Sequence, residues 1–238
     1  MLQSANMVST ISTQMVSKLI AKGVPETRTA ELRNWSDTDL IMPLNAPSPY
    51  RSEWGISAPH VALYSGNISR KQGIGLIVDA AKLLSHRRDL QFIICGNGPE
   101  RKALEREVAR LPNIILRDLQ PKERLSELLG LADIHLLPQI AGAADLMLPS
   151  KMANMFASGR PVIATATTGS GIADAVEGHG LITPPGDAPQ FAQAISDLLD
   201  SPEERAAVGL RARYAAEMHW SKRAITRQFV EMAEHLVH

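Results

Sequence analysis

From His60 onward, short apolar runs alternate with segments whose apolar residues recur at helical spacing, and this alternation restricts the fold more than any other feature. The near-continuous apolar runs are residues 61–64, 91–95, 114–116, 134–137, 161–164 and 180–183. Strands that are apolar on both faces belong to parallel sheets covered by helices on both sides. The sequence therefore predicts an α/β domain with a doubly wound, Rossmann-like parallel sheet.

The remaining segments predict helices around this sheet and at both ends of the chain. Helical periodicity or outward-facing charge indicates helices at 74–84, 99–110, 125–131, 187–199, 202–218 and 221–237. Before the domain, one amphipathic helix is expected from Met7 to Lys22, and a proline-rich stretch follows from Pro43 to Pro59.

Composition disfavours several classes of partner and location. Lys plus Arg and Asp plus Glu number 25 each, so there is no net field to attract nucleic acid. No apolar run approaches the roughly 20 residues that span a bilayer, and the N-terminus lacks a secretory pattern. Cys95 lies inside an apolar run, which predicts a buried thiol in a reducing compartment. We expect a cytoplasmic chain, either free or peripheral at the inner face of the membrane.

Two glycine-flanked turns carry the features of a phosphate site. Residues 66–73 (GNISRKQG) join a predicted strand to a helix, with Arg70 and Lys71 among their side chains. A second helix is entered through Pro149 and Ser150 and is followed by a strand, so its first amides also suit an anion. The alternative for the first turn is a tight connection without a ligand.

Two other motifs are better explained by local structure than by a cofactor or metal site. The turn at 95–101 (CGNGPER), with Asp118 at a suitable distance, is similar to a dinucleotide fingerprint. Arg101 replaces the third glycine, which disfavours a nicotinamide oxidoreductase and leaves the turn a supporting role. The Asp37-Thr38-Asp39 pair lies outside any strand end and predicts an Asp turn, so no metal site is expected.

Several motifs together resemble one family. They are Ser65-Gly66-Asn67, Gly96-x-Gly98-Pro99, Ala132-Asp133, Pro149-Ser150-Lys151 and Gly159-Arg160-Pro161. In combination they resemble the donor-binding half of retaining, family 4 type GT-B glycosyltransferases, similar to those of colanic acid and exopolysaccharide biosynthesis. The resemblance implies a UDP-sugar or GDP-sugar donor, bound without a metal or other cofactor.

The resemblance also implies a set of donor-binding residues. Many relatives carry an arginine and a lysine where this chain has Asn67 and Gln72, so Arg70 or Lys71 is expected to supply the charge. Relatives often carry two glutamates eight positions apart, the first touching the donor sugar and the second the ribose, and these positions hold Leu146 and Asn154 here. We therefore expect Asn154 to contact the ribose and neighbouring Asp145 to contact the sugar. A capping residue or a solvated loop charge is the alternative for Asp145. The full expected set is Gly66, Asn67, Arg70, Lys71, Gly96, Leu119, Gln120, Asp145, Pro149, Ser150, Lys151 and Asn154, with the nucleobase near Leu119 and Gln120.

The same resemblance divides the chain and its functions. Residues 1–58 correspond to the last helix of an N-terminal domain and a linker, 59–219 to the nucleotide-sugar domain, and 220–238 to a helix packing toward the N-terminal domain. The implied reaction transfers sugar to a polysaccharide or lipid-linked precursor, with acceptor-side residues outside this chain. We therefore expect no transfer by this chain alone and self-association through uncovered terminal helices. The alternative is a non-catalytic module that only holds the donor.

Overall fold

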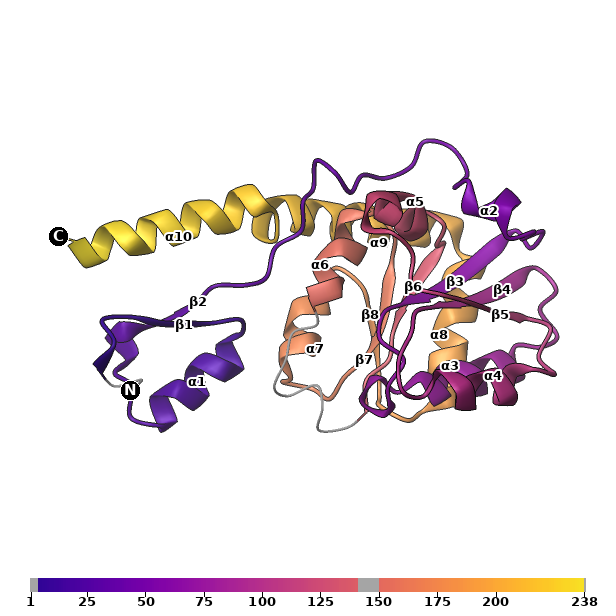
Figure 1. Cartoon of the computed structure of the whole chain (residues 1–238), viewed down its shortest axis with the longest axis horizontal. Helices are drawn as coiled ribbons and strands as arrows, with labels where there is room; N and C mark the ends of the chain where they lie inside the picture. Colours follow the sequence, from indigo (N-terminus) through magenta and orange to yellow (C-terminus); the bar gives the residue numbers. More distant parts are fainter. Residues whose placement is uncertain (1–3, 141–149, 238) are drawn as a thin grey trace.

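A six-stranded parallel sheet forms the centre of the molecule (Figure 1). This computed structural model describes residues 4–140 and 150–237. The strands are β3 (His60–Ser65), β4 (Leu90–Cys95), β5 (Ile114–Arg117), β6 (Ile134–Leu137), β7 (Val162–Thr165) and β8 (Leu181–Thr183). Their order is β5-β4-β3-β6-β7-β8, and each pair is parallel. The six predicted strands and the doubly wound topology are confirmed.

Helices cover both faces of the sheet, because successive side chains of each strand point to opposite faces and both sets are mostly apolar. One face packs against α3 (Ile74–Leu83), α4 (Arg101–Val108) and α8 (Ala188–Asp200). The other face packs against α5 (Leu125–Gly130), α6 (Ser150–Ala157), α7 (Gly171–Val176) and α9 (Pro202–His219), with the short α2 (Tyr50–Glu53) at its edge. Within β3, Ala62 and Tyr64 join the first layer while Val61 and Leu63 join the second. Cys95 is fully buried, as predicted.

The N-terminal segment differs from the single helix expected from Met7. Residues Val8–Thr10 form strand β1, which pairs in parallel with β2 (Thr29–Glu31), and helix α1 covers only Thr13–Ala21. Ser12 has extended backbone dihedrals, and its Oγ accepts a hydrogen bond from the Met15 amide at 3.2 Å. This N-cap fixes where the helix begins, and β-branched Val8 and Thr10 suit the strand before it. A 3₁₀ turn, Glu26–Arg28, leads into β2.

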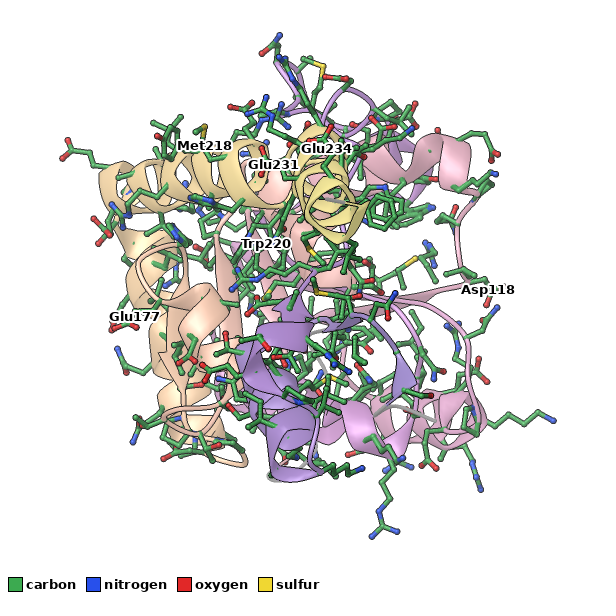
Figure 2. All side chains as sticks on the ribbon, turned by 90° about the vertical axis from the view of Figure 1, so that its left-hand side faces the viewer. Asp118, Glu177, Met218, Trp220, Glu231 and Glu234 are labelled. Carbon is green, nitrogen blue, oxygen red and sulfur yellow. The ribbon has the colours of Figure 1, made fainter. Side chains whose placement is uncertain are left out.

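This small unit lies below α10 (Lys222–Val237), at the end of the molecule that also holds both termini (Figure 1). Gln14 donates to Asp174 of α7 at 2.6 Å, and Gln228 of α10 donates to the Glu31 carbonyl at 2.8 Å. In Figure 2, Trp220 points inward beneath α10, where it is only 4% exposed. These bonds attach the unit to α7 of the sheet domain and to α10. The proposed division after residues 58 and 219 stays a prediction.

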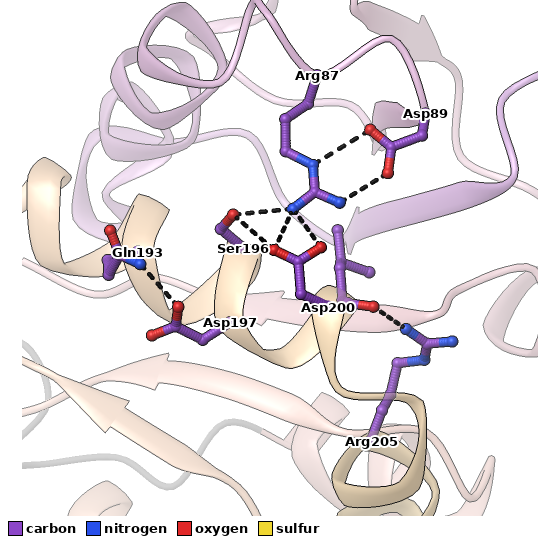
Figure 3. A network of polar contacts seen from close by, with 8 residues as sticks. Arg87, Asp89, Gln193, Ser196, Asp197, Asp200 and Arg205 are labelled. Carbon is purple, nitrogen blue, oxygen red and sulfur yellow. Dashed lines mark hydrogen bonds and ion pairs between the residues drawn. The ribbon is translucent and has the colours of Figure 1, made fainter.

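A polar network fastens the connection between α3 and β4 to α8 (Figure 3). Arg87 makes a bidentate pair with Asp89 and also donates to Ser196 and Asp200, both at 2.8 Å. Nearby, Arg205 donates to the Leu199 carbonyl at the end of α8. Because α3 and α8 cover the same face, this network holds two neighbouring helices in one layer.

No helix within residues 4–140 or 150–237 has the length and apolar character needed to cross a membrane.

Candidate functional site

The order of the strands creates a crevice where the chain leaves β3 and β6, since successive connections depart in opposite directions there. Ligands of open parallel sheets bind at such a switch point, outside the carboxyl ends of the strands. The turn after β3 contains Gly66 and a 3₁₀ segment, Arg70–Gln72. Helix α6 begins at Ser150 on the other side of the switch point. The sequence-predicted phosphate elements therefore meet at this edge of the sheet.

The second glycine turn, after β4, supports the first one. The Gly66 amide donates to the Cys95 carbonyl, and the Ile68 amide donates to the Asn97 carbonyl, both at 2.9 Å. A Cβ on Gly96 would lie 1.8 Å from the Gly66 carbonyl oxygen. The two turns can approach this closely only because Gly96 lacks a side chain. The supporting role predicted for this turn agrees with these contacts.

Arg101, which replaces the third glycine of a dinucleotide fingerprint, holds the same turn. Its Nη1 donates to the carbonyls of Gly96 at 2.7 Å and Arg117 at 2.8 Å. Nε also pairs with Glu105 at 2.9 Å. The guanidinium thus ties the ends of β4 and β5 together, and its side chain is only 16% exposed. This bracing explains why an arginine occupies the position.

Three side chains from separate elements converge beside Gly66. Lys151 of α6 places its Nζ 4.0 Å from the centroid of the Tyr64 ring and donates to Gln72 Oε1 at 3.3 Å. The Tyr64 hydroxyl donates to the Asn67 carbonyl at 2.7 Å, so β3 also braces the turn. A Cβ on Gly66 would lie 3.3 Å from Lys151 Nζ. The ammonium therefore lies directly against the backbone of the predicted phosphate turn.

Burial changes the protonation of this cluster. It lowers the pKa of Lys151 to about 7 and raises the pKa of the Tyr64 phenol. A buried ammonium loses hydration, which the ring and one neutral amide oxygen replace only in part. The cluster thus holds a cation that an anionic ligand would stabilise.

A second polar layer holds Gln72, and sequence reasoning did not select its members. Gln139, two residues after β6, donates through Nε2 to Gln72 Oε1 at 3.4 Å. Its backbone amide and carbonyl both bond the Thr165 hydroxyl, at 2.7 and 2.9 Å. Tyr64, Gln139 and Thr165 were missed because each lies in or beside an apolar run that indicates core. A polar residue at the end of such a run is the signal that was available.

The other predicted site residues lie around this cluster or fall outside the residues that the structure describes. Arg70 and Lys71 are exposed on their 3₁₀ turn, and Asn67 is exposed beside them. Asn154 lies three residues after Lys151, and Ser150, Lys151 and Asn154 are the least buried residues of α6. These three share one face of the helix. Asp145 and Pro149 lie outside the described residues.

The residues expected at the nucleobase follow β5, at the same edge of the sheet. Leu119 is 66% exposed. Gln120 is held by its side chain, which accepts from the Tyr50 hydroxyl at 3.1 Å and donates to the Asp118 carbonyl at 2.7 Å. The ends of β5, β4 and β3 therefore lead from Leu119 past Gly96 to Gly66.

Two features lie apart from the cluster. A pocket of about 550 Å³ is lined by Arg70 and Gln139 but also by α3 and α4, and neither Gly66 nor Lys151 lines it. We place the site at Lys151, where the predicted turn and helix meet. Asp37 accepts hydrogen bonds from the amides of Asp39 and Leu40, so the predicted Asp turn is confirmed.

The sheet, its switch point and the two opposed turns define a doubly wound α/β domain with two glycine turns and the start of α6 at its carboxyl edge. The chain belongs to the family described as "Glycosyl transferases group 1", whose model matches residues 59–201.

Curated relatives agree with this membership. The chain is 31% identical over 237 residues to the putative colanic acid biosynthesis glycosyl transferase WcaI of Escherichia coli K12, covering 96% of this chain and 57% of the relative. It is 26% identical to the putative colanic acid biosynthesis glycosyltransferase WcaL of the same organism, covering 95% and 56%. The chain therefore spans a little over half the length of these relatives.

Solved structures share the fold. Anabaena Alr3699/HepE in complex with UDP superposes with a TM-score of 0.85 at 19% identity, covering 97% of this chain and 64% of that one. Sucrose-phosphate synthase from Thermosynechococcus elongatus gives a TM-score of 0.80 at 22% identity, covering 99% and 59%. The GT-B fold implied by the sequence motifs is confirmed.

Proposed function

We propose that this chain binds the nucleotide-sugar donor of a retaining, metal-independent glycosyltransferase, and that the acceptor is a polysaccharide or lipid-linked precursor. The observation that carries this proposal is the Lys151 ammonium, which lies against the Gly66 turn at the start of α6. Backbone amides and a cation in one crevice suit a diphosphate. The Anabaena relative in fold is a complex with UDP, which supports the same class of ligand.

The chemistry expected of such a site is stabilisation of a leaving group. When the bond between sugar and diphosphate breaks, negative charge develops on the diphosphate. Amides and an ammonium that are already oriented stabilise this charge without rearranging. Transfer also requires an acceptor held near the sugar, and correct positioning is worth about 7–11 kcal/mol of the barrier.

Nucleotide binding is the direct test of the donor proposal. We expect UDP or GDP to raise the melting temperature of the chain, because a ligand at a hundred times its Kd adds about 2.7 kcal/mol to the free energy of unfolding. NAD is the matched control, since Arg101 fills the place of the third fingerprint glycine. Stabilisation by NAD and not by either diphosphate would refute the proposal. Because we expect no transfer by this chain alone, binding without transfer to a labelled acceptor fits both this proposal and a donor-holding module, and observed transfer would exclude the module.

Asn154 is proposed as the contact to the ribose. It lies on the least buried face of α6, together with Lys151. We expect Asn154→Ala to weaken UDP or GDP binding without lowering the melting temperature of the free protein. Asn154→Glu should preserve or improve binding, because hydrogen bonds to a charged acceptor are roughly twice as strong. Unchanged affinity in the alanine variant, measured by calorimetry, would remove this role.

A further inference from the structure

Lys151 is half-buried, and its ammonium, which lies inside the cluster, has no acidic partner among residues 4–140 and 150–237. Its Nζ contacts the face of Tyr64 from β3 and the amide oxygen of Gln72 from the following turn. Both groups are neutral. A lysine in a folded core is ordinarily paired with a carboxylate, since the loss of hydration is otherwise poorly compensated. The positive charge of this ammonium is therefore not compensated by an anion among these contacts.

The position of the ammonium indicates which anion is missing. Nζ would lie only 3.3 Å from a Cβ on Gly66, so the ammonium is within contact distance of the backbone of this turn. The Gly66 turn also lies near the first residues of α6, whose amides have no partner within the helix. A phosphate placed there would meet backbone amides and the ammonium together.

Arg70 and Lys71 are placed differently. Both side chains are exposed on the 3₁₀ turn, where water and salt screen their charge. The Lys151 ammonium is shielded by the Tyr64 ring, and Gln72 is held in turn by Gln139. A charge that is fixed and shielded from water contributes more to binding than one that is mobile and hydrated.

We infer that Lys151, rather than Arg70 or Lys71, is the principal cation for the donor diphosphate, and that Tyr64 and Gln72 are its positioning residues. This inference rests on the proposed function and deepens it. The Gln72 side-chain oxygen lies 3.3 Å from the same ammonium, so side chains at positions 72 and 151 reach the same point in space. A lysine at position 72 would therefore deliver its ammonium to the place that Lys151 now fills.

Protonation should be linked to binding. Burial lowers the pKa of Lys151 to about 7, and a bound dianion would raise that pKa again. Among the described residues, the other titratable group in contact with Nζ is the Tyr64 phenol, whose raised pKa keeps it neutral. Arg70 and Lys71 are the charged side chains on the neighbouring turn. Binding should therefore take up a proton and weaken as the pH rises from 7 to 9.

The experiment is calorimetric titration of UDP and GDP into the whole chain. We expect Lys151→Met to weaken binding by about tenfold or more, as for a lost charged hydrogen bond. The double variant Arg70→Ala/Lys71→Ala should lose roughly two- to fivefold, because exposed charges contribute less. Lys102→Met removes an exposed lysine of α4 and serves as the matched control, with unchanged affinity.

The exchange variant makes the inference specific. The double variant Gln72→Lys/Lys151→Met keeps an ammonium at the same point but supplies it from position 72. We expect its affinity for UDP or GDP to return to within about threefold of that of the original protein. Melting temperatures show that each variant is folded. If Lys151 were only structural, a lysine at position 72 would not restore the affinity. The loss of Lys151 would then also leave the decline of affinity between pH 7 and 9 unchanged.

Each outcome bears on one proposal. If the unaltered chain binds neither diphosphate, the proposed function fails and the role of Lys151 with it. If it binds and Lys151→Met binds equally well, only the inference on Lys151 is overturned. If Lys151→Met is weak, but the exchange variant is folded and equally weak, Lys151 acts through packing and the inference is again overturned.

Discussion

At the scale of single residues, a glycine decides whether the two turns of the site can meet. A Cβ on Gly96 would lie 1.8 Å from the Gly66 carbonyl oxygen, whereas a Cβ on Gly75 in α3 would have no neighbour within 4 Å. We expect Gly96→Ala to lower the free energy of unfolding by about 1–3 kcal/mol, the usual cost of overpacking. Gly75→Ala should raise it by about 0.4–1 kcal/mol. Urea titration measures both, and equal stability of the two variants would contradict the close approach.

The protonation of Lys151 makes a second prediction at this scale. In the unfolded chain a lysine titrates at about 10.4, and in the folded protein burial lowers its pKa to about 7. Between these values the unfolded state binds the extra proton, so raising the pH favours the folded state. We expect the unfolding free energy of the protein, relative to Lys151→Met, to rise by up to about 1.4 kcal/mol per pH unit. Urea titrations at pH 7.5, 8.5 and 9.5 measure this, and a constant difference would show an ordinary exposed lysine.

At the scale of elements, Arg87 joins the turn before β4 to α8 (Figure 3). Its guanidinium also holds the pKa of Asp89 below its usual range. Because the partners are partly exposed, we expect Arg87→Met to cost about 1–2 kcal/mol of unfolding free energy. The loss should be full near pH 7 and shrink once the pH falls below about 4, because the unfolded chain then takes up a proton that Asp89 of the folded protein accepts only at a lower pH.

Arg110 supplies the control for this element-scale prediction. It is exposed after α4, so Arg110→Met should change the unfolding free energy by less than about 0.5 kcal/mol. A loss of similar size in both variants, measured by denaturant titration, would mean that the Arg87 network adds nothing specific.

At the scale of the whole molecule, terminal helices leave apolar side chains uncovered. Phe229 of α10 is 55% exposed, Leu236 is 46% exposed, and Ile20 of α1 is 37% exposed. Glu231 and Glu234 lie on the same helix (Figure 2). We expect association that increases with protein concentration, since such surfaces are ordinarily covered. Sedimentation of Phe229→Glu should show a shift toward monomer.

Leu83→Glu is the matched control for the association prediction. Leu83 is 49% exposed on α3, in the sheet domain rather than on a terminal helix. A monomer at every concentration, or an equal shift in both variants, would refute association through α10.

Much of the fold followed from the sequence because its signals are local. A strand buried on both faces needs an apolar run, and a helix needs apolar residues at its own period, so β3 to β8 and the main helices were predictable. Strand β1 was not, because three residues form a strand only through pairing with β2, about twenty residues later. The Ser12 cap was the local signal that the helix begins later.

The sequence by itself therefore determined the class of fold, the buried state of Cys95 and the two turns with the chemistry of a phosphate site. Only the tertiary structure decided which cation stands at that site. Tyr64 and Gln72 lie on β3 and the turn after it, whereas Lys151 comes 79 residues after Gln72, and the strand order that places β3 beside β6 brings them into contact. Burial, which shifts a lysine's pKa and fixes its ammonium, depends on all the surrounding elements at once. Residue type and spacing contain no such information.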